Sequence, residues 1–385
     1  MSRPRMIGQV LHPYNLQKAL GQVIANKGGA GIDGKRTDGF ADYFREHKAS
    51  ILQSIKDDTY LPKPILGVGI PKGNGKTRLL GIPTVTDRLL QQAVSHYLMP
   101  KYGHGFSVHS YGFRPHKNAR QAVGKVLEHI HGGNTFIVDI DLKTFFDEVD
   151  HCLLLNLLYQ KVKCPTTLRL IRKWLRVPIQ IDGRLQKRRK GVPQGSPISP
   201  LLSNILLNEL DRELTGRKLR FVRYADDFSI YTKRKSDAET TMKVIENFLR
   251  TKLKLTINRE KSGVRKPVQF TILGFGFVPT YKKGDKGRYQ LVVSEKAWKR
   301  LKTSVKAITC KTRPMSFNER IAKIKEAQRG WLNYFRGTNI YGKLKDLDGW
   351  LRNRLRYCIW HHWKKPDRKR KNLIRLGVDQ DYNRD

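Results

Sequence analysis

Two acidic segments that lie far apart in this 385-residue chain constrain its fold most strongly. Residues 224–227 read Tyr-Ala-Asp-Asp between two short strand-like runs, which predicts a hairpin with adjacent carboxylates at its turn. In residues 137–141, apolar side chains alternate with Asp139 and Asp141, so both aspartates lie on one face of a strand. Neighbouring carboxylates repel one another unless a cation neutralises them. The pattern therefore predicts two strands that bring carboxylates together around metal ions.

Hard oxygen ligands of this kind suit magnesium, whose coordination is completed by nucleotide phosphates. Two acidic segments on separate strands are also what a two-metal nucleic-acid polymerase site requires. The alternative for each segment is structural: Asp139 and Asp141 could line a solvated strand edge, and aspartate is common in turns. The apolar neighbours Val138 and Ile140 favour a mostly buried strand. Alternation does not decide whether Asp139 or Asp141 is the direct ligand.

The charge of the chain indicates a polyanionic partner. Lysine and arginine total 76 against 33 acidic residues, a net charge of +43. This favours RNA or DNA over a membrane surface or an acidic protein. The N-terminus has no apolar signal region, and no apolar run reaches membrane-spanning length. We therefore expect a soluble protein in the cytoplasm, with no membrane partner.

The pattern of apolar residues predicts a mixed α+β chain with a helical end. Residues 12–60 have helical periodicity, interrupted by a glycine-rich turn that is either a structural loop or a backbone cradle for phosphate. Residues 64–83 are typical of a β-hairpin, and a helix is expected from Asp87. Strand-like and helical segments alternate over 100–280, and from about 295 the pattern is helical.

Short motifs occur in a fixed order along nearly the whole chain. They occupy residues 26–34, 70–84, 87–88, 110–115, 139–142, 191–200, 224–227, 255–262, 273–275 and 329–335. In these motifs and their order the chain resembles the group II intron-encoded reverse transcriptases, also called maturases. The resemblance implies a right-hand polymerase with fingers and palm, followed by an all-helical thumb. It divides the chain into an N-terminal extension (1–60), fingers and palm (61–290), a thumb or maturase X domain (291–365) and a basic tail (366–385).

The resemblance also assigns catalytic roles. It implies that Asp141, Asp226 and Asp227 bind two Mg²⁺ ions, with Asp139 as a supporting or alternative ligand. Lys261 is expected to protonate the pyrophosphate leaving group, and the alternative is a solvated lysine.

Several residues are expected to contact the incoming deoxynucleoside triphosphate. Lys72 and Arg78 flank the turn of the 64–83 hairpin, where two cations can clamp a triphosphate, unless the turn is merely solvated. Gln194 and Gly195 lie in a tight loop that permits close backbone approach, or that simply leads into the next helix. Phe145 is the expected steric gate against ribonucleotides, with core packing as the competing explanation.

Four arginines are expected to contact nucleic acid. Arg114 and Arg329 lie within the matched motifs, whereas Arg352 and Arg356 lie in the C-terminal helical region among tryptophans. Arginine interleaved with aromatic residues can follow an RNA or a template–primer duplex. Because tryptophan at helical spacing is more often core, the tryptophans are assigned mostly to packing.

These expectations combine into an RNA-directed DNA polymerase that extends a DNA or RNA primer on an RNA template. The resemblance adds binding of a group II intron RNA, assistance in its splicing, and intron homing. The alternatives are a non-catalytic splicing factor, a defence-associated or domesticated reverse transcriptase, and an RNA-dependent RNA polymerase. Relatives of this kind usually continue into a DNA-binding region and sometimes an endonuclease. The sequence has no Cys/His cluster for an endonuclease, so we expect no cleavage of target DNA by this chain.

Overall fold

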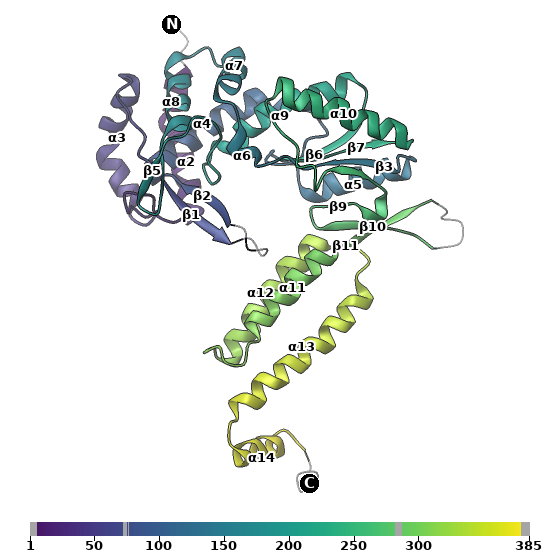
Figure 1. Ribbon diagram of the computed structural model, residues 1–385. Helices are drawn as coiled ribbons and strands as arrows, with labels where there is room; N and C mark the ends of the chain where they lie inside the picture. The colour runs from purple at the N-terminus through teal and green to yellow at the C-terminus, as the bar shows by residue number, and fades with distance from the viewer. Residues whose placement is uncertain (1–5, 72–74, 76, 282–286, 379–385) are drawn as a thin grey trace. The chain divides into compact units, whose positions relative to one another are not determined.

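The computed structural model describes residues 6–71, 75, 77–281 and 287–378. The chain divides into two compact units, Met1–Arg265 and Lys266–Asp385. Figure 1 shows the course of the chain through both units.

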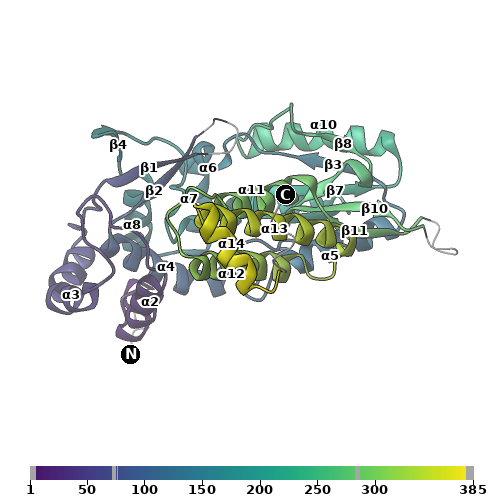
Figure 2. The same cartoon turned by 90° about the horizontal axis from the view of Figure 1, so that it is seen from below.

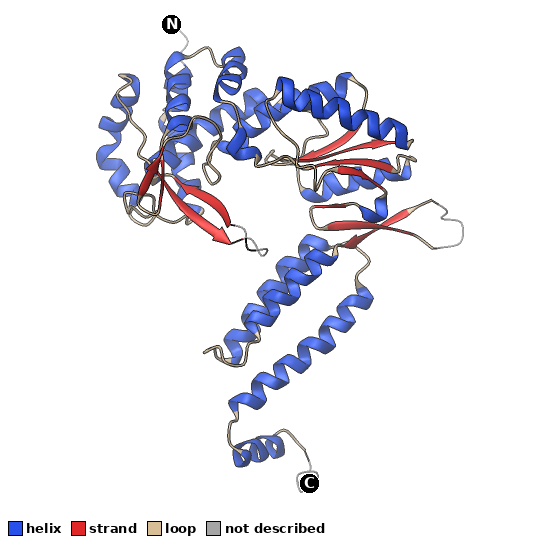
Figure 3. Ribbon diagram, in the orientation of Figure 1, coloured by secondary structure: helices blue, strands red, loops and turns tan. Residues whose placement is uncertain are grey.

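An antiparallel sheet of four strands forms the centre of one part of the first unit. Its strands lie in the order β6-β7-β3-β8, with β3 at Phe136–Ile140, β6 at Arg220–Tyr224, β7 at Asp227–Thr232 and β8 at Gly263–Arg265. Helices α9 (Ser199–Gly216) and α10 (Lys235–Lys252) cover one face, and α5 (Ala119–His131) packs along β6 (Figures 1 and 3). Val138 and Ile230 are fully buried in the same apolar core as Ile245 of α10. The alternating aspartates therefore lie on the opposite face.

The rest of the first unit combines a second sheet with a group of helices. The sheet has the order β2-β1-β4-β5, formed by β1 (Ile65–Pro71), β2 (Thr77–Ile82), β4 (Ile179–Ile181) and β5 (Arg184–Gln186). Helix α2 (Pro13–Ala25) lies alongside α4 (Val85–Gly103), as Figure 2 shows. The remaining helices are α1 (Met6–Val10), α3 (Phe40–Lys56), α6 (Phe145–Glu148), α7 (His151–Lys161) and α8 (Pro165–Arg176).

The second unit begins with a small sheet and continues as helices. The 3₁₀ turn η1 (Pro267–Gln269) precedes strands in the order β11-β10-β9, namely β9 (Thr271–Ile272), β10 (Phe275–Pro279) and β11 (Tyr289–Val293). The helices are α11 (Glu295–Ile308), α12 (Phe317–Phe335), α13 (Tyr341–His362) and α14 (Pro366–Arg375). Aromatic residues pack the small sheet against α12. The ring centroid of Phe335 on α12 lies 4.9 Å from that of Phe275 on β10 and 4.8 Å from that of Trp331.

The mixed α+β composition predicted from the sequence is confirmed, as are the hairpin over 64–83 and the helical end. The helix expected from Asp87 begins two residues earlier, because the Thr84 side chain caps it by accepting the Asp87 N–H. Part of the expected tail, Pro366–Arg375, is helical. None of the helices in the described ranges is both long and apolar enough to cross a bilayer.

Candidate polymerase active site

The register of the central sheet brings the two acidic segments together. Asp139 pairs with Ser229 and Ile140 pairs with Phe228 across β3 and β7. One further step along each strand places Asp141 at the end of β3 beside Asp227 at the start of β7. Tyr224 pairs with Asp227 to close the hairpin that carries Asp226. Two segments that lie far apart in the sequence therefore present carboxylates at one end of one sheet.

The electrostatics of these carboxylates indicate a shortage of positive charge. Burial, together with the nearby charges of Asp226, Asp141 and Asp139, raises the pKa of Asp227 to about 6, although the charge of Lys261 opposes the shift. Burial also raises the pKa of Asp226. A cation would remove this repulsion, and carboxylate oxygens are the ligands that magnesium prefers.

The carboxylates do not form a closed metal cage. Over the described residues, no group of three or more His, Cys, Asp and Glu side chains is arranged to hold a metal ion. An open cluster suits magnesium, which takes few protein ligands and completes its shell with water and phosphate oxygens. The donor set therefore fits Mg²⁺ that arrives with a nucleotide.

Asp139 and Asp141 have different partners. Asp139 accepts a hydrogen bond from Arg265 of β8 at 2.9 Å, and burial still raises the pKa of Asp139. Asp141 faces Lys261, whose ammonium lies 3.5 Å away, and the Asp141 backbone N–H donates to Ser262 Oγ at 3.0 Å. Because Arg265 already engages Asp139, the geometry favours Asp141 as the direct ligand. Lys261 also lies within reach of the cluster, as its expected role requires.

A buried ion pair contacts the backbone of the acidic turn. Arg223 and Asp211 of α9 are both 0% exposed and form two hydrogen bonds of 2.7 and 2.6 Å. The remaining Arg223 nitrogen donates to Asn204 and to the carbonyl of Ala225, each at 2.9 Å. Ala225 has a φ of +58°, a left-handed conformation that is costly for alanine. The network therefore supports the turn that carries Asp226. An arginine inside a strand is the only sign of this network that can be read from the sequence.

The candidate nucleotide-binding residues of the first unit also converge. Arg78 of β2 donates a hydrogen bond to the Gln194 side chain, and its charge lowers the pKa of Asp226 against the effect of burial. The Gly81 N–H donates to the Gln194 carbonyl at 2.7 Å. Gly195 has a φ of +109°, and a Cβ there would lie 2.6 Å from the Gly81 carbonyl oxygen. The loop is therefore fixed against β2. Lys72 lies outside the described residues.

Phe145 lies in the apolar core at 2% exposure. Its ring meets Phe146 edge-on at 5.2 Å, and Phe146 is only partly buried. Burial of Phe145 favours the core-packing explanation that competes with the steric gate, and Phe146 is the more accessible ring. The gate assignment stays a prediction.

Arg114 and the glycine-rich turn make contacts within the chain. Arg114 donates to the carbonyls of Ser107, Ser110 and Gly103, so it holds the preceding loop. In the turn, Arg88 donates to the Gly29 carbonyl at 2.7 Å, and a Cβ on Gly31 would lie 2.7 Å from Thr84 Cα. These glycines fit a structural loop packed on α4 rather than a phosphate cradle. Nucleic-acid contact by Arg114 remains a prediction.

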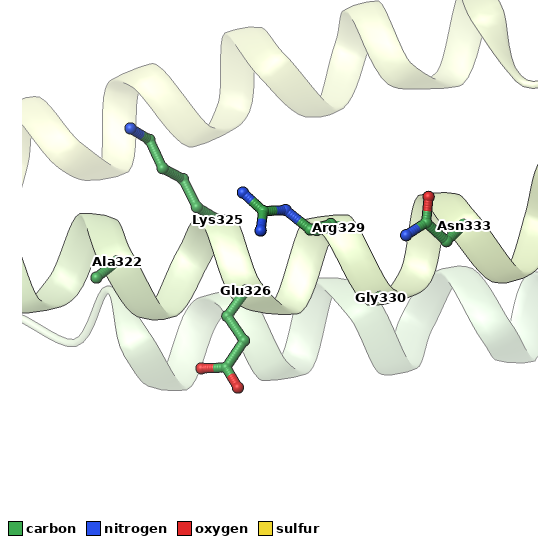
Figure 4. A pocket seen from close by; sticks show the side chains of 6 residues that line it. All are labelled: Ala322, Lys325, Glu326, Arg329, Gly330 and Asn333. Carbon is green, nitrogen blue, oxygen red and sulfur yellow. The ribbon is translucent and has the colours of Figure 1, made fainter.

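One face of α12 forms a hollow of about 400 Å³ that includes Arg329 (Figure 4). The small residues Ala322 and Gly330 open the helix surface, while Lys325 and Arg329 project from one side of it and Glu326 from the other. A helix face with small residues and cations allows a phosphate backbone to approach closely.

The other two candidate arginines lie on α13. Arg352 and Arg356 are exposed. Arg352 pairs with Asp348 at 2.8 Å, and Arg356 donates to Asn353 at 3.3 Å. Both stay candidates for phosphate contact.

Comparison with known proteins decides the family. The profile named Reverse transcriptase (RNA-dependent DNA polymerase) matches residues 70–277, more than half of the chain. The chain belongs to the reverse transcriptase family. A second profile, Group II intron, maturase-specific domain, matches residues 298–377. The fold class predicted from the sequence and the resemblance to group II intron-encoded proteins are thereby confirmed.

Relatives of this reverse transcriptase include group II intron proteins. The Group II intron-encoded protein LtrA of Lactococcus lactis subsp. cremoris is 37% identical over 222 residues, which cover 57% of this chain and 36% of LtrA. Protein YkfC of Escherichia coli (strain K12) is 30% identical over 304 residues, 68% of this chain and 79% of YkfC. A solved structure, the partial Cas6-RT-Cas1–Cas2 complex, is 22% identical, with a TM-score of 0.42 over 65% of this chain and 43% of that one. The matched region spans about a third of the length of LtrA.

Proposed function

We propose that this reverse transcriptase is an active RNA-directed DNA polymerase that extends a primer on an RNA template with deoxynucleoside triphosphates. The observation that carries the proposal is the meeting of Asp141, Asp226 and Asp227 at one sheet end. Arg78 is close enough to lower the pKa of Asp226. RNA binding alone would not require a cluster of carboxylates in a chain of charge +43.

The roles of the residues follow from their positions. Asp141, Asp226 and Asp227 would hold two Mg²⁺ ions, with Asp139 supporting them from its pair with Arg265. When bound, the metal ions would stabilise the attacking 3′-oxygen and the leaving pyrophosphate. Arg78 would orient the triphosphate from the hairpin, together with Lys72. The loop at Gln194 and Gly195 would present its backbone to the primer or nucleotide.

Two further roles concern the leaving group and the sugar. Lys261, with its ammonium 3.5 Å from Asp141, would deliver a proton to the departing pyrophosphate. Phe145 would exclude a 2′-hydroxyl, acting with the more exposed Phe146 that packs against it. Replacement of Phe145 by alanine tests the gate through the rate of ribonucleotide incorporation; unchanged sugar selectivity would contradict it.

A second function is binding of a group II intron RNA and assistance in its splicing, with a part in intron homing. The observation that favours it is the match of residues 298–377 to the maturase-specific domain. Arg329, Arg352 and Arg356 lie in this range and would contact RNA phosphates. We propose the cytoplasm as the site of action. We also propose that the chain consists of an N-terminal extension (1–60), fingers and palm (61–290), a thumb (291–365) and a basic tail (366–385).

The test is primer extension on a defined RNA template with magnesium and deoxynucleotides. The wild type is compared with the double variant Asp226→Ala/Asp227→Ala. We expect extension by the wild type only, while both proteins bind structured RNA equally. Extension by the double variant would refute the metal assignment. No extension by either protein, with tight RNA binding retained, would favour a splicing factor without polymerase activity.

A further inference from the structure

Aromatic and basic residues gather near the junction of α13 and α14, and Figure 1 shows where this junction lies along the chain. Its residues line a hollow of about 430 Å³: Tyr357, Trp360, His361, Lys364 and Lys369. We call these five residues the 357–369 surface. Tyr357 is 57% exposed and Trp360 is 44% exposed, although rings of this size are usually mostly buried. The assignment of the tryptophans to packing therefore does not hold for Trp360.

The packing of α13 does not require these side chains. The buried residues of α13 are Leu347, Leu351 and Cys358, which repeat at helical spacing along one stripe. Cys358 also contacts the end of α11, since its Sγ lies 3.3 Å from the Thr309 carbonyl oxygen. The 357–369 surface lies beside this stripe. Packing in the core therefore does not explain why the rings of Tyr357 and Trp360 are exposed.

Cations accompany both exposed rings. The Lys369 ammonium lies 4.6 Å from the centroid of Trp360. The Lys311 ammonium lies 4.9 Å from the centroid of Tyr357 and donates to its hydroxyl at 3.1 Å. None of the five lining residues is acidic. Each ring therefore combines a flat apolar face with a positive charge close by.

We propose that the 357–369 surface binds an unpaired stretch of RNA by stacking bases on Tyr357 and Trp360. Lys364 and Lys369 contact the adjacent phosphates. Aromatic rings interleaved with cations are the usual platform for single strands, because each unpaired base exposes a π-face that a duplex keeps inside. The choice of RNA over DNA rests on the proposed function. The proposal that bases stack here rests only on the exposed rings and the cations beside them.

The test measures binding of full-length protein to a fluorescent, unstructured oligouridine at raised salt, where contacts made through phosphates alone are weakened. The variant Tyr357→Leu/Trp360→Leu is expected to bind about tenfold or more weakly. The control is Tyr341→Leu, which removes a tyrosine that is 81% exposed at the start of the same helix. This control is expected to bind like the wild type.

Two further sets of variants test the aromatic and the basic residues of this surface separately. The conservative variant Trp360→Phe is expected to retain most of the affinity, and its circular dichroism should match that of the wild type. Lys364→Gln/Lys369→Gln should weaken binding and lower the salt dependence, whereas the aromatic double variant should keep the salt dependence. Unchanged oligouridine binding by the aromatic double variant would overturn the proposal. So would a variant that binds oligouridine normally but loses self-association or protein binding.

If the aromatic double variant lost affinity for oligothymidine as much as for oligouridine, the surface would bind single-stranded DNA as well, which would contradict the choice of RNA. Because the assay measures binding, its result is independent of primer extension.

Discussion

At the scale of single residues, the acidic turn depends on a buried charge that does not touch the substrate. Arg223 bonds both oxygens of Asp211 and also the carbonyl of Ala225, whose backbone is left-handed. We expect Arg223→Met to lower the free energy of unfolding by about 3–5 kcal/mol, because it leaves a buried carboxylate unpaired. Urea-induced unfolding, followed by a spectroscopic signal from the first unit, measures this change in the free energy of unfolding.

A double variant separates stability from positioning of the turn. Arg223→Met/Asp211→Leu removes both charges, so most of the lost stability should return. The hydrogen bond to Ala225 would still be missing. We therefore expect primer extension to stay impaired in the stable double variant, with a raised magnesium requirement. Full recovery of extension would show that the network supports stability alone.

A buried histidine in α5 predicts how stability changes with pH. Burial lowers the pKa of His129 to about 4, helped by the charge of Lys125, while Glu128 opposes the shift and His109 and Arg220 add to it. The unfolded histidine titrates near 6.5, so between pH 6.5 and 4 the unfolded state binds more protons. Stability should therefore fall as the pH falls through this window. Unfolding midpoints at pH 7.5 and 5 measure the effect, and His129→Phe should reduce it; an unchanged pH dependence in that variant would contradict the assignment.

The meeting of the acidic residues was easier to predict from the sequence than the contacts of the residues that support them. Aspartates at a turn and on an alternating strand are local patterns, and the register then brings them together. Arg223 and Asp211 are twelve residues apart on a strand and a helix, and their pairing depends on how those elements pack. Arg265, which engages Asp139, is equally invisible in sequence, since surface arginines abound in this chain.

At the scale of elements, the loop that carries Gln194 and Gly195 is fixed to strand β2. We expect Gly195→Ala to reduce primer extension strongly and to raise the deoxynucleotide concentration needed for half-maximal rate. An alanine at a φ of +109° is strained, and its Cβ would lie 2.6 Å from the Gly81 carbonyl oxygen. Relief of that clash would move the loop away from β2 and Arg78. Steady-state extension at varied deoxynucleotide measures both effects.

Gly183→Ala is the matched control for this prediction. Gly183 also has a positive φ, +79°, but a Cβ there meets no atom within 4 Å. It therefore carries the backbone strain without the clash. Extension by Gly183→Ala should remain near the wild-type level. Equal losses in both variants would show that backbone strain, rather than the fit against β2, explains the effect.

Elements with a local signal were predicted from the sequence, and elements defined by distant pairing were not. The 64–83 hairpin and the C-terminal helices have clear periodicity, and the structure has both. The parallel pairing of β1 with β4 has no local signal, because Ile65 meets Ile179 across more than a hundred residues. The exposure of Trp360 is a third case: its spacing is typical of a core residue, but the core stripe of α13 runs through Leu347, Leu351 and Cys358 instead.

At the scale of the whole molecule, the net charge of +43 predicts that phosphate contacts dominate the affinity for RNA. Each neutralised phosphate releases counterions, so the binding constant should fall linearly with salt on a double logarithmic scale. For roughly six to ten such contacts, raising salt from about 50 to 200 mM should weaken binding by about 10³–10⁵-fold.

Fluorescence anisotropy with a structured RNA across this range of salt measures the slope. Asp226→Ala/Asp227→Ala is the control, because the proposed metal ligands should contribute little to phosphate neutralisation and leave the slope unchanged. An affinity that barely responds to salt would mean that base stacking and shape, rather than the distributed positive charge, hold the RNA.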